Sequence, residues 1–310
     1  GEYENLTVQN IEIKEDELKF KGLHFFTKYT KAELSKIIPH ERDHYNIEVP
    51  VLSVSNFKYG FNEKEDFFAS AKMVALDHPD VDVYRDKTVK DDETFKPLYS
   101  RSLRNFPFAL TVDSVKIKDA AVKYTERVHK ENHGGHVTFQ NLNIGISDVS
   151  NTYSSPTKTR ANVKALFMDT TPFTALWEFD VNNTNDHFLF QAQVNRLDAS
   201  RMNQFTEPNI RVKFEGFADK TYFTIDGNNE NSKTNLRIEF SDLKVILIDK
   251  ETHKKRKILS AIANIFVSKN SENNESKYEE ASGEAERNKT QSVFNQLWIS
   301  LESALKKALI

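Results

Sequence analysis

Alternation of apolar and polar side chains is the feature that most constrains this chain. Successive residues of a β-strand point to opposite faces of a sheet, so a period of two predicts strands with one apolar face. The pattern is clearest from Phe173 to Val194 and from Ile210 to Leu247. Turn sequences such as Asn182-Asn183-Thr184-Asn185 separate the runs, and short connections of this kind favour an antiparallel meander.

The first half of the chain shows the same alternation. His78-Pro79 is expected to break one strand from the next, and the charged segment Asp86–Pro97 is expected to be a loop. The predicted strands are Leu6–Ile13, Leu18–Phe26, Tyr45–Tyr59, Ala69–Leu76, Val81–Arg85, Phe108–Ile117, Ala121–Val128, Val137–Asp148 and Arg160–Met168. The fold class predicted is mainly β, with a long curved antiparallel sheet (a groove or half-barrel), a few short helices and a C-terminal amphipathic helix.

Short helices are predicted at Ala32–Ile38, Glu63–Phe68 and Ile258–Phe266. The strongest helical pattern lies at the C-terminus, where apolar side chains recur at helical spacing. Its face for a sheet or partner is formed by Phe294, Leu297, Trp298, Leu301 and Leu305. The predicted organisation is an elongated antiparallel β domain with minor helices over 1–267, a polar flexible linker over 268–290 and the amphipathic helix over 291–310.

This terminal helix has two interpretations. It caps the open side of the sheet, which is the usual role of an amphipathic helix, or it lies on a membrane or partner helix, with Lys306 and Lys307 in its last turn. The basic run Lys254–Lys257 likewise suits either anionic lipid or, as we favour, a charged turn before a buried helix.

Composition excludes several classes of protein. The 310 residues include 43 basic and 46 acidic ones, a net charge of −3, which leaves no electrostatic footprint for nucleic acid. With no cysteine, a disulfide scaffold, a thiolate metal site and cysteine catalysis are ruled out. The 23 phenylalanines supply apolar mass for a core. Neither a signal peptide nor an uncharged apolar run of membrane-spanning length occurs, and the start at Gly1 suggests a trimmed fragment.

Two histidine patterns are candidates for metal sites. His40-Glu41-Arg42-Asp43-His44 matches the H-E-x-x-H motif of zinc hydrolases, which needs a helix. Pro39 before it and an alternating strand after it favour a charged loop instead. His129, His133 and His136 surround Gly134-Gly135, which favours a hairpin turn. No phosphate loop, dinucleotide fingerprint or nucleophile elbow is found, so no enzyme activity, catalytic residue or cofactor is predicted.

A family resemblance begins at Tyr45. The segment Phe57-Lys58-Tyr59-Gly60, then Ala69 to Leu76, His78-Pro79 and Val81 to Lys87 resembles the start of AsmA-like proteins of the bacterial envelope. Their following hairpin resembles Val112 to Asp148 here. Their final β region resembles the part of this chain that contains Asn203-Gln204-Phe205, Gly216, Gly227-Asn228-Asn229 and Asp242-Leu243-Lys244-Val245. The likeness covers about Tyr45 to Phe266 and is greatest to the Bacteroidota versions.

The resemblance implies a body in the periplasm, an inner-membrane anchor upstream and a groove that carries phospholipid between membranes. The chain is short for a complete bridge, which leaves a shuttle or one module of a larger assembly. Independently, the alternation predicts an apolar sheet face that suits acyl chains, which bind by buried area. The candidate groove residues are Phe173, Trp177, Phe179, Phe188, Phe190, Phe214, Phe223 and Phe240.

Three functions follow from these observations. The first is a non-enzymatic module that binds or transfers phospholipid or another acyl lipid. The second is a scaffold for envelope assembly, with a closed core and a protein partner on the terminal helix. The third, more remote, is a zinc hydrolase that uses His40, Glu41 and His44.

Overall fold

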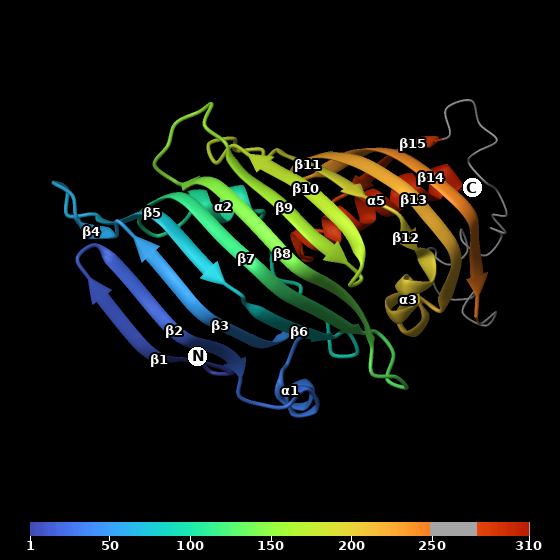
Figure 1. The fold of residues 1–310 in the computed structure, drawn as a ribbon, viewed down its shortest axis with the longest axis horizontal. Helices are drawn as coiled ribbons and strands as arrows, with labels where there is room; N and C mark the ends of the chain where they lie inside the picture. Colours follow the sequence, from blue (N-terminus) through green and yellow to red (C-terminus); the bar gives the residue numbers. More distant parts are fainter. Residues whose placement is uncertain (249–277, 310) are drawn as a thin grey trace.

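A computed structural model describes residues 1–248 and 278–309. Within these residues fifteen strands form one open sheet, with the order β1-β2-β3-β5-β7-β8-β9-β10-β11-β13-β14-β15 (Figure 1). Strands β4, β6 and β12 pair beside this path. The prediction of a mainly β fold with few short helices and a C-terminal helix is confirmed.

Most strands follow the predicted ones apart from their ends, with two corrections. The predicted strand Tyr45–Tyr59 is divided in two near Asn56, which has a φ of 49°. The predicted strands Phe108–Ile117 and Ala121–Val128 form one strand, because the break between them is a shift in register and not a turn. In the first half they are β1 Glu4–Lys14, β2 Glu17–Thr27, β3 Asp43–Ser55, β4 Lys58–Phe61, β5 Phe67–Asp77, β6 Asp80–Asp86, β7 Ala109–Arg127 and β8 Gly135–Ser150. In the second half they are β9 Thr159–Phe167, β10 Thr171–Phe179, β11 Phe188–Val194, β12 Leu197–Asp198, β13 Val212–Gly227, β14 Asn231–Leu247 and β15 Glu279–Glu286.

The sheet is mixed, which corrects the expectation of purely antiparallel pairing. Strands β5 and β6 run in the same direction, each antiparallel to β3 and parallel to β7. His78, with a φ of 49°, and Pro79 interrupt this line without reversing the chain. The 87–108 connection then returns the chain to the end of the sheet where β5 begins, so that β7 runs parallel to β5 and β6. A parallel neighbour requires a long crossover of this kind.

In residues 1–248 and 278–309, five helical segments accompany the strands. They are α1 Lys31–Ile37, α2 Tyr99–Arg104, the 3-10 helix η1 Ala199–Met202, α3 Asn203–Ile210 and α5 Val293–Leu309. Helix α1 begins at a capping box in which Thr30 and Glu33 bond to each other's backbone N–H. In Figure 1, α2 and α5 lie on the same side of the sheet, behind the strands in this view. None of the helices in the described residues is both long and apolar enough to cross a bilayer.

Two predicted elements are corrected. The 63–68 helix does not form, because the side-chain oxygen of Asn62 accepts hydrogen bonds from the backbone of Lys64 and Asp66 and makes a turn before β5. The strand predicted from Ile210 begins only at Val212, after α3. The predicted 258–266 helix and the basic run 254–257 lie outside the described residues.

The predicted linker over 268–290 is corrected in its described part. Residues 279–286 form β15, which pairs antiparallel with β14. Ala281, Gly283 and Ala285 alternate there with charged or polar residues. These small side chains on the inner face leave room for α5. Because they contribute little apolar area, the sequence of β15 does not show the clear apolar–polar alternation that predicts a strand. The terminal helix predicted over 291–310 is confirmed as α5.

Candidate functional site

One face of the sheet carries a row of apolar side chains from its first edge to its last. Directly paired residues on neighbouring strands point to the same face, so the registers trace the row. Its members, in sheet order, are Ile11, Phe20, Leu52, Leu76, Ile117, Ile144, Val163, Ala175, Ala192, Phe223, Leu236 and Ala281. The next row contains Ile13, Leu18, Val54, Val74, Val115, Ile146, Ala161, Trp177, Phe190 and Ile225.

The part of this face that belongs to β10–β14 is a closed core. Among the predicted groove residues, Phe188, Phe190, Phe223 and Phe240 are buried there. The other four, Phe173, Trp177, Phe179 and Phe214, pack against the same cluster. Alternation therefore placed the eight side chains together correctly, but the expectation that they line an open groove is corrected, because helices cover them.

Helix α5 supplies most of this cover. Its Leu297, Leu301 and Leu305 pack against the core, as the capping interpretation predicts. Phe294 and Trp298, assigned to the same face, instead remain 63% and 43% exposed. The line that faces the sheet is formed by Val293, Gln296, Ser300 and Ala304. It escaped prediction because two of its four members are polar.

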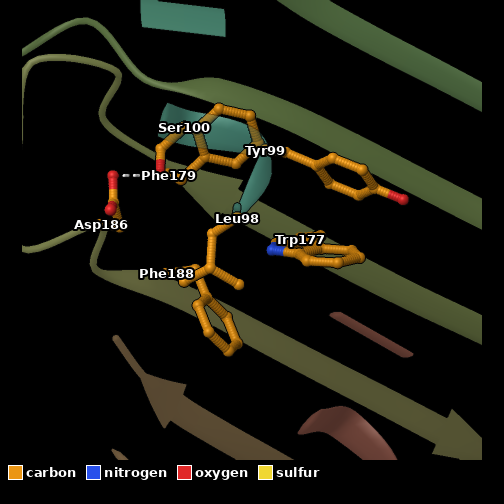
Figure 2. A pocket seen from close by; sticks show the side chains of 7 residues that line it. All are labelled: Leu98, Tyr99, Ser100, Trp177, Phe179, Asp186 and Phe188. Carbon is orange, nitrogen blue, oxygen red and sulfur yellow. Dashed lines mark hydrogen bonds between the residues drawn. The ribbon is translucent and has the colours of Figure 1, made fainter. Parts of the chain in front are cut away.

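The crossover between β6 and β7 covers the remainder. Leu98 is buried against the core, and the Tyr99 and Trp177 rings lie 5.3 Å apart between centroids. Figure 2 shows Ser100 pointing toward Asp186 while Tyr99 lies over Trp177. The cavity between these residues holds only about 10 Å³, which is room for one water molecule at most.

A fully buried carboxylate holds α2 in place. Asp186 is 0% exposed, and its Oδ1 accepts hydrogen bonds from Arg104 Nη2 at 2.7 Å and Ser100 Oγ at 3.0 Å. Its Oδ2 lies 3.0 Å from Arg101 Nε. Buried charges need such partners. The sequence does not predict Asp186 or Arg101 as site residues. An Asp in an Asn-rich turn gives no signal of burial, and without it the role of Arg101 cannot be predicted.

The same apolar rows are open over β1, β2, β3 and β5. Ile11 and Ile13 are 54% and 72% exposed, and Phe20, Leu52 and Leu76 are only half-buried. Helix α5 packs on β13, β14 and β15, and α2 reaches β8. In the described part of the chain, no helix packs broadly on β1, β2, β3 or β5. We call this region the open apolar face.

An ionised cluster limits the open apolar face at one end of β3, β6 and β7. Arg85 Nε donates to Asp43 Oδ1 at 2.6 Å, and Tyr45 Oη lies 3.2 Å from Asp43 Oδ2. Tyr124 Oη donates to Glu126 at 2.9 Å. Burial, reinforced by the negative charge of Asp43, raises the pKa of Tyr45 to about 12. Burial likewise raises the pKa of Tyr124.

The histidine patterns do not form the sites that zinc chemistry needs. His40 lies in a loop after α1, and His44 lies in β3, where Nε2 is 2.9 Å from the Tyr29 carbonyl. Glu41 is buried and paired with Lys87 Nζ at 2.8 Å. His129 and His133 lie in the β7–β8 connection and His136 in β8. Within residues 1–248 and 278–309, no group of three or more potential ligands is placed to hold a metal.

Two comparisons with known proteins found no match for this chain. No family model matches it, and no curated protein is similar to it at a significant level.

Proposed function

We propose that this chain is a non-enzymatic lipid-binding or lipid-transfer module. The observation that carries the proposal is the apolar row from Ile11 to Ala281, which is a packed core over β10–β14, half-buried over β2, β3 and β5, and exposed at Ile11 on β1. Monomeric soluble proteins rarely expose long apolar surfaces without a partner. Acyl chains suit such a face because they gain affinity from buried area alone, at about 25 cal/mol per Å².

The proposed ligand lies along the open apolar face, with its tails against side chains such as Phe20, Leu52 and Leu76. The ionised cluster around Arg85 and Asp43 limits the apolar path at one end. The sequence predicted a lipid groove at the aromatic residues of β10–β14. We now propose that the lipid binds to the first half of the sheet instead.

We further propose a periplasmic location, with an inner-membrane anchor upstream in the full-length protein and membership of the AsmA-like proteins. The order of strands and turns from Tyr45 onward supports this part of the proposal. The mixed sheet with one continuous apolar face is compatible with it.

A scaffold role is the second candidate. The closed core under α5 favours it, because this half of the sheet needs no ligand. Phe294 and Trp298 of α5 remain exposed, although the Phe294 ring also lies 6.5 Å from that of Trp177, and they offer a surface for an envelope protein.

Native mass spectrometry of detergent-free protein, with lipid extraction of the same sample, tests the proposal. We expect co-purifying phospholipid that is lost in Leu52→Asp and reduced in Ile11→Asp, which alters an already exposed side chain. Ser53→Asp, one residue along β3 and on the opposite face, is the matched control. A bare mass for folded wild-type protein, with no uptake of added phospholipid, would reject lipid binding and favour the scaffold.

A further inference from the structure

A polar pocket lies beside α2, on the opposite side from the aromatic contacts of Tyr99. It measures about 350 Å³, and its walls come from α2, the β10–β11 turn and the β13–β14 turn. The lining residues are Arg101, Thr184, Asn185, Asn228, Asn229, Glu230 and Asn231. Amide and hydroxyl groups thus surround a single guanidinium, which is the donor set that an oxyanion prefers.

Positive charge exceeds negative charge around this pocket. Arg101 and Arg104 share the single carboxylate of Asp186. The one acidic lining residue, Glu230, is already paired with Lys289, whose Nζ lies 2.6 Å from both carboxylate oxygens. Because two arginines pair with one buried carboxylate, one positive charge at the pocket wall is not neutralised.

Arg287 adds a third guanidinium close by. It is only 6% exposed, donates to Asn229 Oδ1 at 3.0 Å and donates to the Lys96 carbonyl. Its Nε has no hydrogen-bond partner among the residues that the structure describes. Burial lowers the pKa of Arg287, so the fold keeps this cation in an unfavourable environment beside the pocket, where an anion would stabilise it.

Donors in the pocket remain unused. Arg101 contacts Asp186 through Nε, and within the described residues its two terminal nitrogens make no hydrogen bond. The Asn185 side-chain amide is likewise without a partner there, although its backbone N–H bonds to Asn183 Oδ1 and its carbonyl accepts from Asn229. A guanidinium fork and an amide that line one pocket are donors of the kind that phosphate oxygens accept from.

We propose that this pocket binds a phosphate group, either of a phospholipid head or of a soluble phosphate ester. Helix α2 joins it to the apolar side, because Tyr99 contacts Trp177 and Arg101 lines the pocket two residues later. The cavity between Tyr99 and Trp177 is too small for acyl chains, so a phospholipid with its phosphate at Arg101 would have its tails outside the closed core. The lipid form of the inference rests on the proposed function, whereas the phosphate site itself does not.

Calorimetric titration with three probes separates these cases: a short-chain phospholipid, the diacylglycerol with the same chains, and glycerol 3-phosphate. Asn185→Asp places a negative charge in the pocket while leaving Asp186, Arg101 and Arg104 themselves unchanged. We expect it to weaken both phosphate-containing probes about tenfold and to leave diacylglycerol unchanged. Asn5→Asp on β1, at the opposite edge of the sheet, is the matched control, and Arg101→Gln should reproduce the loss.

Each outcome decides between the proposals. Phospholipid binding that is equal to diacylglycerol binding and insensitive to Asn185→Asp overturns the phosphate site and leaves the lipid module standing. Binding of glycerol 3-phosphate alone, with the expected Asn185 dependence, supports a site for soluble phosphate and rejects the lipid module. If none of the three probes binds folded protein, both proposals fail.

Discussion

The hydroxyl oxygen of Ser300 on α5 lies 2.6 Å from that of Ser232 on β14. Gln296 Nε2 also donates to Ser232 Oγ, at 2.9 Å. These buried hydrogen bonds lie in a largely apolar interface, where they form in only one geometry. They therefore fix where α5 rests on the sheet, and with it which part of the apolar face is closed.

Close contact between α5 and β15 gives the first prediction. A Cβ on Gly283 would lie 2.5 Å from the backbone nitrogen of Ala304 and 2.7 Å from the carbonyl carbon of Ser303. Backbone cannot move aside as a side chain can, so we expect Gly283→Ala to reduce the free energy of unfolding by about 1–3 kcal/mol. Urea titration measures this.

The same chain offers a matched control for that variant. A Cβ on Gly145 of β8 meets nothing within 4 Å, so Gly145→Ala should be close to neutral. Equal stability of the two variants would show that α5 does not rest on β15 as described.

The buried carboxylate of Asp186 gives a second prediction. Asp186→Asn removes the charge that pairs Arg101 and Arg104 while keeping the shape. We expect a loss of about 3 kcal/mol, near the lower end for breaking a buried ion pair because both arginines are partly exposed. Asp226→Asn, at an exposed carboxylate 2.9 Å from His187, should change stability by less than about 1 kcal/mol. Chemical denaturation of the two variants makes the comparison.

Sequence alternation was sufficient for the sheet and for the shared face of residues such as Trp177 and Phe223, because period two follows from strand geometry. It could not show which part of that face is covered. The cover depends on the turn at Asp186, which receives α2, and on small residues of β15 such as Gly283, which admit α5. Both are tertiary relationships between segments distant in sequence, so no local pattern encodes them.

Tyrosine burial in the ionised cluster predicts how stability changes in alkali. The folded pKa of Tyr45 is raised to about 12, whereas that of the unfolded chain is about 10. The unfolded state therefore loses its proton first, and stability is retained below pH 10 and lost as the pH rises toward 12. Tyr124 acts in the same direction. Tyr45→Phe should flatten this decline in thermal melts between pH 9 and pH 12, and an unchanged decline would contradict the assignment.

The environment of Glu41 predicts a structural rather than a catalytic phenotype. Its side chain is 2% exposed and accepts from Lys87 Nζ at 2.8 Å, and the same ammonium donates to Gln291 Oε1 at 3.1 Å. Through Lys87, Glu41 thus connects the β6–β7 crossover and the segment before α5 to the start of β3. Glu41→Gln keeps the shape but weakens a charge-assisted hydrogen bond, so we expect a loss of about 1–3 kcal/mol. Thermal melts should show this loss equally with and without a chelator, and His40→Ala, at an exposed side chain, should have no effect. A melting temperature that falls on chelation in wild type but not in His40→Ala would instead restore the zinc interpretation.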